Sequence, residues 1–213
     1  MIDRVPPGSG ADTPRARQLI AAAYELLEAE GLEGLTIRAV LKRTGLARRA
    51  FYECFAGKDD LVLAVFEFTM RVAALNFEEQ IRLLDDPLER MGAIVIGMVQ
   101  GGLGLENDRI EMSDRRSAAL SSEHLRLAES RPAKLQAALS PLLVLISWQV
   151  AEGIRQGQFR ECDPDLQAML IFNLIATTMH TELLARESGS LDKGRRRKLA
   201  DEIWEFCRRA IIA

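Results

Sequence analysis

Hydrophobic residues recur at three- and four-residue spacing along most of the chain, which is the period of an α-helix. The first such stretch follows Thr13 and Pro14, a residue type that caps helices and one that suits the first helical turn. Gly31 is expected to end this helix, because glycine readily adopts the left-handed conformation found at helix ends. The apolar stripe between them consists of Leu19, Ile20, Ala23, Tyr24 and Leu27.

Two short helices are predicted next, separated by a tight turn. Thr36 is a candidate N-cap for the first, whose apolar stripe ends at Thr44-Gly45 after about two turns. The second runs from near Ala47 to near Cys54. Two short helices joined by a turn that contains glycine have the layout of a helix-turn-helix.

The remaining chain also predicts helices, and no segment alternates with the period of a strand over more than a few residues. Residues near 111–128 are more polar and only weakly patterned, and Pro141 is expected to kink or restart the helix around it. The low aromatic content of 6% and the frequent Ala, Leu, Glu and Arg also favour helices over strands. We therefore predict an all-α fold, with further helices at about 61–77, 87–101, 132–157, 164–189 and 191–212.

The composition predicts a cytoplasmic protein that associates with no membrane. No run of 18 apolar residues occurs, and the first residues lack the apolar core of a signal peptide. Three widely spaced cysteines suit reduced thiols better than a disulfide framework. We expect residues 1–12, rich in Gly, Pro and Asp, to be a disordered extension.

Positive charge is concentrated in the predicted helix-turn-helix. The chain carries a net charge of -3, yet five cations and no acid lie between Thr36 and Tyr52. Such a patch suits the phosphate backbone of a nucleic acid, and the alternative is a solvated helical face. A second basic run, 193–198, is expected to be the solvated start of the last helix. The five cations are Arg38, Lys42, Arg43, Arg48 and Arg49.

Three aromatic residues divide the third helix into two faces. Phe51 and Phe55 fall on one face, which is expected to pack on the first helix. Tyr52 falls beside the basic side chains, where its hydroxyl can reach a phosphate. The alternative for Tyr52 is a core ring whose hydroxyl meets water.

The order of these residues resembles the DNA-binding domain of the TetR family of transcriptional regulators, over about residues 14–65 and without gaps. A looser resemblance covers residues 152–165, before the family's dimer interface. The resemblance implies a three-helix DNA-binding domain at 13–58 and a helical ligand-binding and dimerisation domain at 59–213. The residues that carry it are Ile20 to Leu27 with Gly31, Leu35 to Val40, Thr44 to Phe55, and Lys58 to Leu61.

The resemblance also implies which residues contact DNA. The start of the third helix enters the major groove, where Arg48 and Arg49 can pair with guanine, while Tyr52 and Lys58 hold the backbone. This sequence departs from the family at Ala47, which cannot cap that helix as the usual Ser does. It also departs at Arg49, where a small residue is common, and Glu53 is less favourable near DNA than a cation. The expected contact set is Thr36, Arg38, Ala47, Arg48, Arg49, Tyr52 and Lys58.

The last two predicted helices favour a homodimer. The helix after Pro164 is apolar nearly all round, so one side needs a partner. The last helix has a single apolar stripe, and two such helices from each subunit make a four-helix interface. The alternative is burial within a monomer. The expected interface residues are Leu166, Leu170, Ile203, Phe206 and Ala210.

A regulator of this kind needs an effector pocket, and an apolar setting favours a hydrophobic or amphipathic small molecule. Each candidate has an ordinary alternative as a satisfied core or surface group. The candidates are polar or polarizable side chains within apolar helices: Met98, Met112, His124, Trp148, Gln149, Asn173, Thr177 and His180.

We therefore predict a homodimeric repressor that binds a palindromic DNA operator and is released by its effector. No nucleophile elbow, phosphate-binding glycine loop or His-Glu-x-x-His motif occurs, so no catalytic residue, metal site or cofactor is predicted. Two alternatives remain open: an effector-dependent activator, and a helical adaptor that binds another protein.

Overall fold

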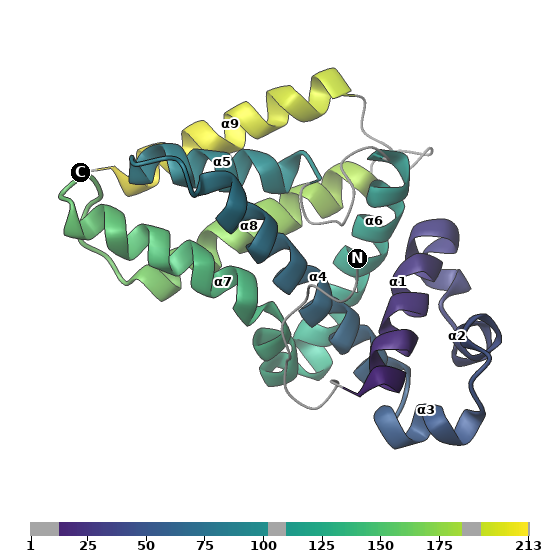
Figure 1. The fold of residues 1–213 in the computed structure, drawn as a ribbon. Coiled ribbons are helices and arrows are strands. Elements are labelled where there is room, and N and C mark those ends of the chain that lie inside the picture. The colour runs from purple at the N-terminus through teal and green to yellow at the C-terminus, as the bar shows by residue number, and fades with distance from the viewer. Residues whose placement is uncertain (1–12, 102–109, 185–192, 213) are drawn as a thin grey trace. The chain divides into compact units, whose positions relative to one another are not determined.

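The computed structural model describes residues 13–101, 110–184 and 193–212, without the side chains of 110–115, 183, 184 and 193. The predicted extension at 1–12 lies outside these residues. Within the described ranges the chain forms α-helices and no strand, which confirms the all-α prediction (Figure 1). The helices are α1 (Pro14–Gly34), α2 (Ile37–Thr44), α3 (Arg48–Cys54), α4 (Lys58–Ile81), α5 (Pro87–Val99), α6 (Ile110–Ser130), α7 (Pro132–Arg155), α8 (Pro164–Leu184) and α9 (Lys193–Ile211).

The chain divides into two compact units. The first, called the N-terminal unit below, comprises Met1–Thr69 and Arg109–Leu139. The second, the C-terminal unit, comprises Met70–Asp108 and Ser140–Ala213. This packing division differs from the functional division predicted at residue 58, which stays a prediction.

In the N-terminal unit, α1 packs against α2, α3 and α6 (Figure 1). Thr13 caps α1 as predicted, because its hydroxyl accepts a hydrogen bond from the amide of Ala16 at 3.1 Å. Gly31 has a φ of 69°, so the chain leaves helical geometry where glycine was expected to end the helix. One more helical turn then leads to Gly34.

Charged contacts attach α6 to α1, which explains why its sequence lacks a clear apolar stripe. Arg116 is only 2% exposed and forms an ion pair with Glu28 of α1. The Arg116 guanidinium also lies over the ring of Tyr24, 4.5 Å from its centre. A buried cation is tolerated when it is paired in this way.

A second set of ion pairs joins the start of α4 to α6 and α7. Arg126 lies 2.7 Å from Asp59, and Arg131 lies 2.6 Å from Asp60. Lys134 also contacts Asp60, at 3.2 Å. The hydrogen bond from Arg126 lowers the pKa of Asp59 below its ordinary value. The first turn of α4, directly after the helix-turn-helix, is therefore fixed to the rest of its unit.

In the C-terminal unit, α5 packs against α8 and α9. Gly92 permits the close approach of α9, since a Cβ there would lie 3.1 Å from the ring of Trp204. The chain end is held by the amide of Arg160, which donates to the carbonyl of Ile211 at 2.9 Å. These contacts cover one side of α9.

Helix α7 does not restart at Pro141, which corrects one of the two outcomes expected there, while the kink stays a prediction. Pro141 lies inside the helix, which runs on to Arg155. Proline removes one backbone hydrogen bond, and α7 continues in spite of that loss. Within the described ranges, α7 alone is long and apolar enough to cross a membrane, judged by length and composition. Core helices of soluble proteins also pass this test, and 50% of the apolar window of α7 is buried.

The basic run at 193–198 is not uniformly solvated, which corrects the expectation from sequence. Arg196 is buried, and its Nη1 donates to the carbonyl of Val99 at 3.4 Å. Arg195 pairs with Glu182 of α8 at 2.8 Å. Two of these cations therefore hold the start of α9 on neighbouring helices.

Candidate functional site

The turn between α2 and α3 is formed by three local features. The hydroxyl of Thr36 accepts a hydrogen bond from the amide of Ala39 at 3.0 Å and so caps α2. Gly45 ends α2 in the left-handed conformation, with a φ of 69°, and its amide donates to the carbonyl of Leu41 at 2.9 Å. The amide of Leu46 donates to the hydroxyl of Thr44 at 3.3 Å. The chain is thereby redirected from α2 into α3, as predicted.

Two aromatic rings anchor α3. Phe51 and Phe55 are both buried, and their ring centres lie 5.8 Å apart. This confirms the packing face predicted from their spacing. A helix of seven residues is too short to be stable alone, so its position depends on these rings.

The opposite face of α3 is exposed and polar. Tyr52 is 46% exposed, so it is not a core ring. Its hydroxyl accepts a hydrogen bond from Arg48 at 3.4 Å, and the Arg48 guanidinium carbon lies 5.6 Å from the ring centre. Arg48 and Tyr52 therefore form one surface that can meet phosphate or a base edge.

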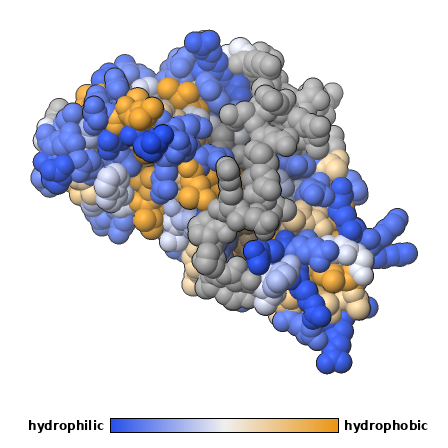
Figure 2. All heavy atoms as spheres, in the orientation of Figure 1, coloured by the Kyte–Doolittle hydropathy of each residue, from blue (hydrophilic) through white to orange (hydrophobic). Residues whose placement is uncertain are grey.

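The start of α3 has no side-chain cap, as expected for Ala47. The backbone of Ala47 is extended, and no side chain accepts a hydrogen bond at this cap. Lys58 begins α4 and is half-buried. In Figure 2 hydrophilic side chains cover most of the region where Figure 1 draws α2 and α3.

Acidic neighbours neutralise part of the positive charge. Arg43 pairs with Glu25 of α1 at 2.9 Å, and Arg49 pairs with Glu53 at 3.0 Å. Glu53 also contacts Arg15 at 3.2 Å. The pairs with Glu25 and Arg15 were not predictable from local spacing, because both of these residues lie on α1. Exposed pairs contribute only about 0–1 kcal/mol, so a phosphate can displace them.

The other three cations of the patch have no acidic partner among the described residues. They are Arg38, Lys42 and Arg48, and all three are exposed. Their positive charge is available to a polyanion without the loss of an internal ion pair. We conclude that the α2–α3 surface, defined by Thr36, Arg38, Lys42, Arg48, Arg49 and Tyr52, can bind the phosphate backbone of a duplex and present arginines to bases.

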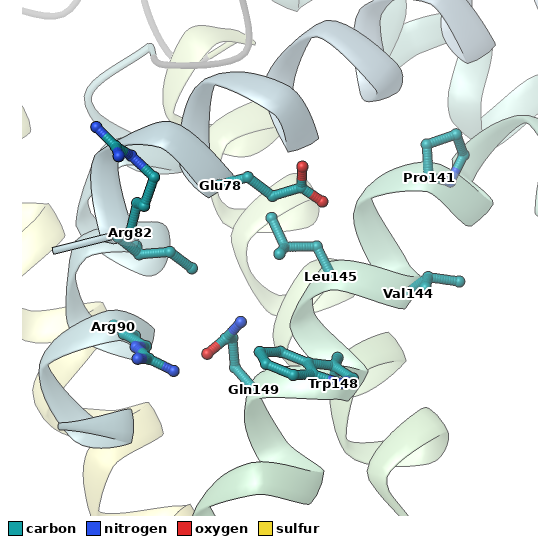
Figure 3. Close-up of a pocket in the computed structure, with 9 residues that line it drawn as sticks. Glu78, Arg82, Arg90, Pro141, Val144, Leu145, Trp148 and Gln149 are labelled. Atoms are coloured by element: carbon teal, nitrogen blue, oxygen red, sulfur yellow. The ribbon is translucent and has the colours of Figure 1, made fainter. Parts of the chain in front are cut away.

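Two of the predicted pocket residues, Trp148 and Gln149, line one cavity of about 480 Å³ in the C-terminal unit (Figure 3). The amide oxygen Oε1 of Gln149 is buried and accepts no hydrogen bond from a described residue. The charged lining was not predictable from the sequence, because three helices bring it together. The other lining residues are Glu78, Ile81 and Arg82 of α4 and the segment after it, Arg90 of α5, and Pro141, Val144 and Leu145 of α7.

The remaining predicted pocket residues lie elsewhere. Met98 is buried, and His124 lies in the N-terminal unit, where its ring centre is 6.4 Å from that of Phe66. Asn173 and Thr177 are exposed on α8. His180 has a buried Nδ1 without a hydrogen-bond partner among the described residues. The side chain of Met112 lies outside the described residues.

The predicted interface residues differ in exposure. Leu166, Leu170 and Phe206 are 49%, 52% and 64% exposed, whereas Ile203 is buried in its own unit. Ala210 is half-buried. The described part of the chain contains no group of three or more neighbouring His, Cys, Asp or Glu residues that could hold a metal ion.

Comparisons with known proteins agree with this geometry. Residues 19–65 match the family described as bacterial regulatory proteins, tetR family. The chain is 26% identical, over 79% of its length and 83% of the relative's, to the fatty acid metabolism regulator protein of Bacillus subtilis (strain 168).

Two solved structures share the fold over most of the chain. The fatty acid degradation regulator FadR from Bacillus halodurans aligns with a TM-score of 0.69 and 19% identity, over 92% of this chain and 95% of that one. RolR in complex with resorcinol aligns with a TM-score of 0.68 and 17% identity, over 92% and 86%. Residues 19–65 therefore resemble bacterial regulatory proteins of the tetR family, and most of the chain shares the fold of the two solved regulators.

Proposed function

We propose that two copies of the chain form a repressor that binds a palindromic operator through α3 and is released by a small hydrophobic or amphipathic effector. The proposal places the protein in the cytoplasm and assigns it no catalytic role. It includes the DNA contacts Thr36, Arg38, Ala47, Arg48, Arg49, Tyr52 and Lys58 expected from the sequence.

The observation that carries the dimer is the apolar surface of α8 and α9. Leu166 and Leu170 are exposed and lie one helical turn apart on α8. Phe206 of α9 is more exposed than either of them. Large apolar side chains that are this exposed mark interaction surfaces when they cluster on one face. A second copy can cover them with the same residues about a two-fold axis.

DNA geometry also favours two copies. A single α3 is seven residues long and presents few side chains to base edges. Two such helices about 34 Å apart can read half-sites that are one turn of the duplex apart. A two-fold dimer therefore predicts an operator with inverted-repeat symmetry.

The cavity of the C-terminal unit supports the proposal of an effector site. Its volume of about 480 Å³ suits a small organic molecule. An effector that binds one conformation better than another shifts the population, and a difference of about 1–3 kcal/mol is typical. Helix α4 contributes residues to this cavity and, at its other end, follows the helix-turn-helix directly.

Sedimentation and gel-shift experiments on the full chain test the dimer. Leu170→Glu is expected to convert the dimer to a monomer and to abolish cooperative operator binding, because it places a charge in an apolar interface. Leu83→Glu is the matched control, since Leu83 is 79% exposed and lies outside the predicted interface. A wild-type monomer that binds its operator fully would contradict the dimer, and an operator bound only in the presence of effector would contradict release by the effector.

A further inference from the structure

A buried polar atom without a partner lies in the wall of the C-terminal cavity. Gln149 is 1% exposed, and its Oε1 accepts no hydrogen bond from a described residue. Buried polar atoms in folded proteins nearly always have a partner, so an exception in a cavity wall indicates a ligand or solvent group. A ligand that donates an N–H or O–H to this oxygen would complete the site.

Arg90 is the cation best placed to bind a charged group there. Its Nε donates to the carbonyl of Leu84 at 2.6 Å, which fixes the guanidinium while leaving both Nη atoms without a hydrogen-bond partner among the described residues. Glu152 interacts with Arg90 electrostatically, but its carboxylate is hydrogen-bonded to Arg155 and Gln156. In Figure 3 Arg90 extends from α5 toward the amide of Gln149. Because the guanidinium is fixed, little side-chain entropy is lost when an oxyanion binds.

The other two charged groups of the cavity have different roles. Arg82 pairs with Glu79 at 3.1 Å, and in Figure 3 its guanidinium points away from Gln149. Glu78 is exposed and has no ion-pair partner among the described residues. The carboxylate of Glu78 repels an anion in the cavity, so the attraction of Arg90 for the anion must exceed this repulsion.

The rest of the wall is apolar. Trp148 and Leu145 of α7 lie beside Arg90 and Gln149 (Figure 3). Ile81 of α4 also lines the cavity. Trp148 is more than half exposed, so its ring offers apolar surface that a ligand can cover. One end of the cavity therefore suits a charged or polar head, and the remaining surface suits a hydrocarbon.

We propose that this cavity binds an amphipathic organic acid that carries a hydrogen-bond donor close to its acid group. The oxyanion binds the free Nη atoms of Arg90, the donor reaches Oε1 of Gln149, and the hydrocarbon lies along Trp148 and Leu145. This inference rests on the proposed function only in taking the cavity as the effector site.

Calorimetric titration of the full chain with three matched molecules tests this assignment. N-decanoylglycine has the acid, the amide N–H and an alkyl chain. Its methyl ester lacks the charge, and tridecanoate has the same chain length but lacks the N–H. We expect the ester to bind about tenfold or more weakly than the acid, and tridecanoate about three- to tenfold more weakly.

Variants assign these differences to residues. Arg90→Gln should remove the preference for the acid over its ester, whereas Arg209→Gln, which removes an exposed cation outside the lining of the cavity, should retain it. Gln149→Leu should weaken N-decanoylglycine and leave tridecanoate unchanged. Glu78→Gln should tighten both acids about two- to fivefold, and it keeps the test valid if Arg90→Gln does not fold.

The outcomes separate this inference from the proposed function. Equal affinity for the acid and its ester, or weaker binding of the acids to Glu78→Gln, would overturn the inference. If the acid binds as described but leaves operator binding unchanged in gel shifts, the inference holds and the effector role fails. If the acid does not bind while another molecule releases the operator, the inference fails and the proposed function stands.

Discussion

The α2–α3 surface and the cavity of the C-terminal unit are built on opposite principles. The surface has many exposed charges from one short stretch of sequence, and its internal ion pairs are weak enough for phosphates to displace. The cavity has a few polar groups from three helices, including an amide oxygen with no partner among the described residues. The free energy of DNA binding is therefore spread over many contacts of the surface, whereas ligand binding in the cavity depends on a few individual polar contacts.

The largest expected effect concerns the support of the surface rather than its charges. Phe51→Ala should destabilise the protein by about 3–5 kcal/mol, because the ring is fully buried beneath a seven-residue helix. Chemical denaturation measures this loss, and DNA binding should fall with it. Tyr52→Ala is the exposed control on the same helix, and an equal loss for both variants would show that α3 is not anchored by Phe51.

Arg48 tests whether the surface reads sequence as well as charge. Arg48→Ala should cost about 1–3 kcal/mol of discrimination at one base pair in each half-site. Lys58→Ala should instead weaken binding to all sequences alike. Binding to a library of single-base operator variants measures both, and a uniform loss across the library for Arg48→Ala would remove its assigned role.

Glu53 tests whether the internal ion pairs restrain the surface. Glu53→Gln should strengthen DNA binding by about 0.2–1 kcal/mol, because it frees Arg49 and Arg15 for phosphates. Titrations at several salt concentrations should also show a steeper salt dependence. Glu79→Gln breaks an exposed pair in the other unit and should change neither quantity. Unchanged binding by Glu53→Gln would mean that DNA already displaces this pair at no cost.

The smallest effect is an acid dependence in the C-terminal unit. Hydrogen bonds from Arg208 and Arg209 lower the pKa of Glu205 to about 2. A carboxylate whose pKa is lowered by folding stabilises the folded state at any pH above its pKa in the unfolded chain. This stabilisation is lost as the pH falls from about 4.5 toward 2. Thermal unfolding over that range should show a shallower acid loss for Glu205→Gln than for the wild type, and parallel curves would contradict the shift.

The contrast between the two sites also explains what the sequence could predict. The helix-turn-helix is encoded locally by the capping Thr36, the left-handed Gly45 and the two aromatic anchors of α3. Thr36 and Gly45 act on neighbours within a few residues, and the spacing of Phe51 and Phe55 marks the face of α3 that packs on α1, so spacing alone places all four. The expected DNA contacts follow from the same short stretch.

Features that depend on distant partners were not predictable in this way. The packing of α6 relies on Arg116 and Glu28, which lie 88 residues apart. The cavity combines Glu78, Arg90 and Gln149 from three helices, and a charged residue on a helix otherwise indicates only a solvated face. Trp148 and Gln149 were found because a polar group in an apolar helix is unusual, a signal that also selected residues outside this cavity.

The central claim is that two copies of α3 read one symmetric duplex. Selection of bound sequences from random duplexes, followed by the mass of the resulting complex, tests it most directly. The account predicts an inverted repeat with half-site centres about 10 base pairs apart, or a multiple of that, bound by an even number of protomers. A selected site without symmetry, bound by a single protomer, would contradict it.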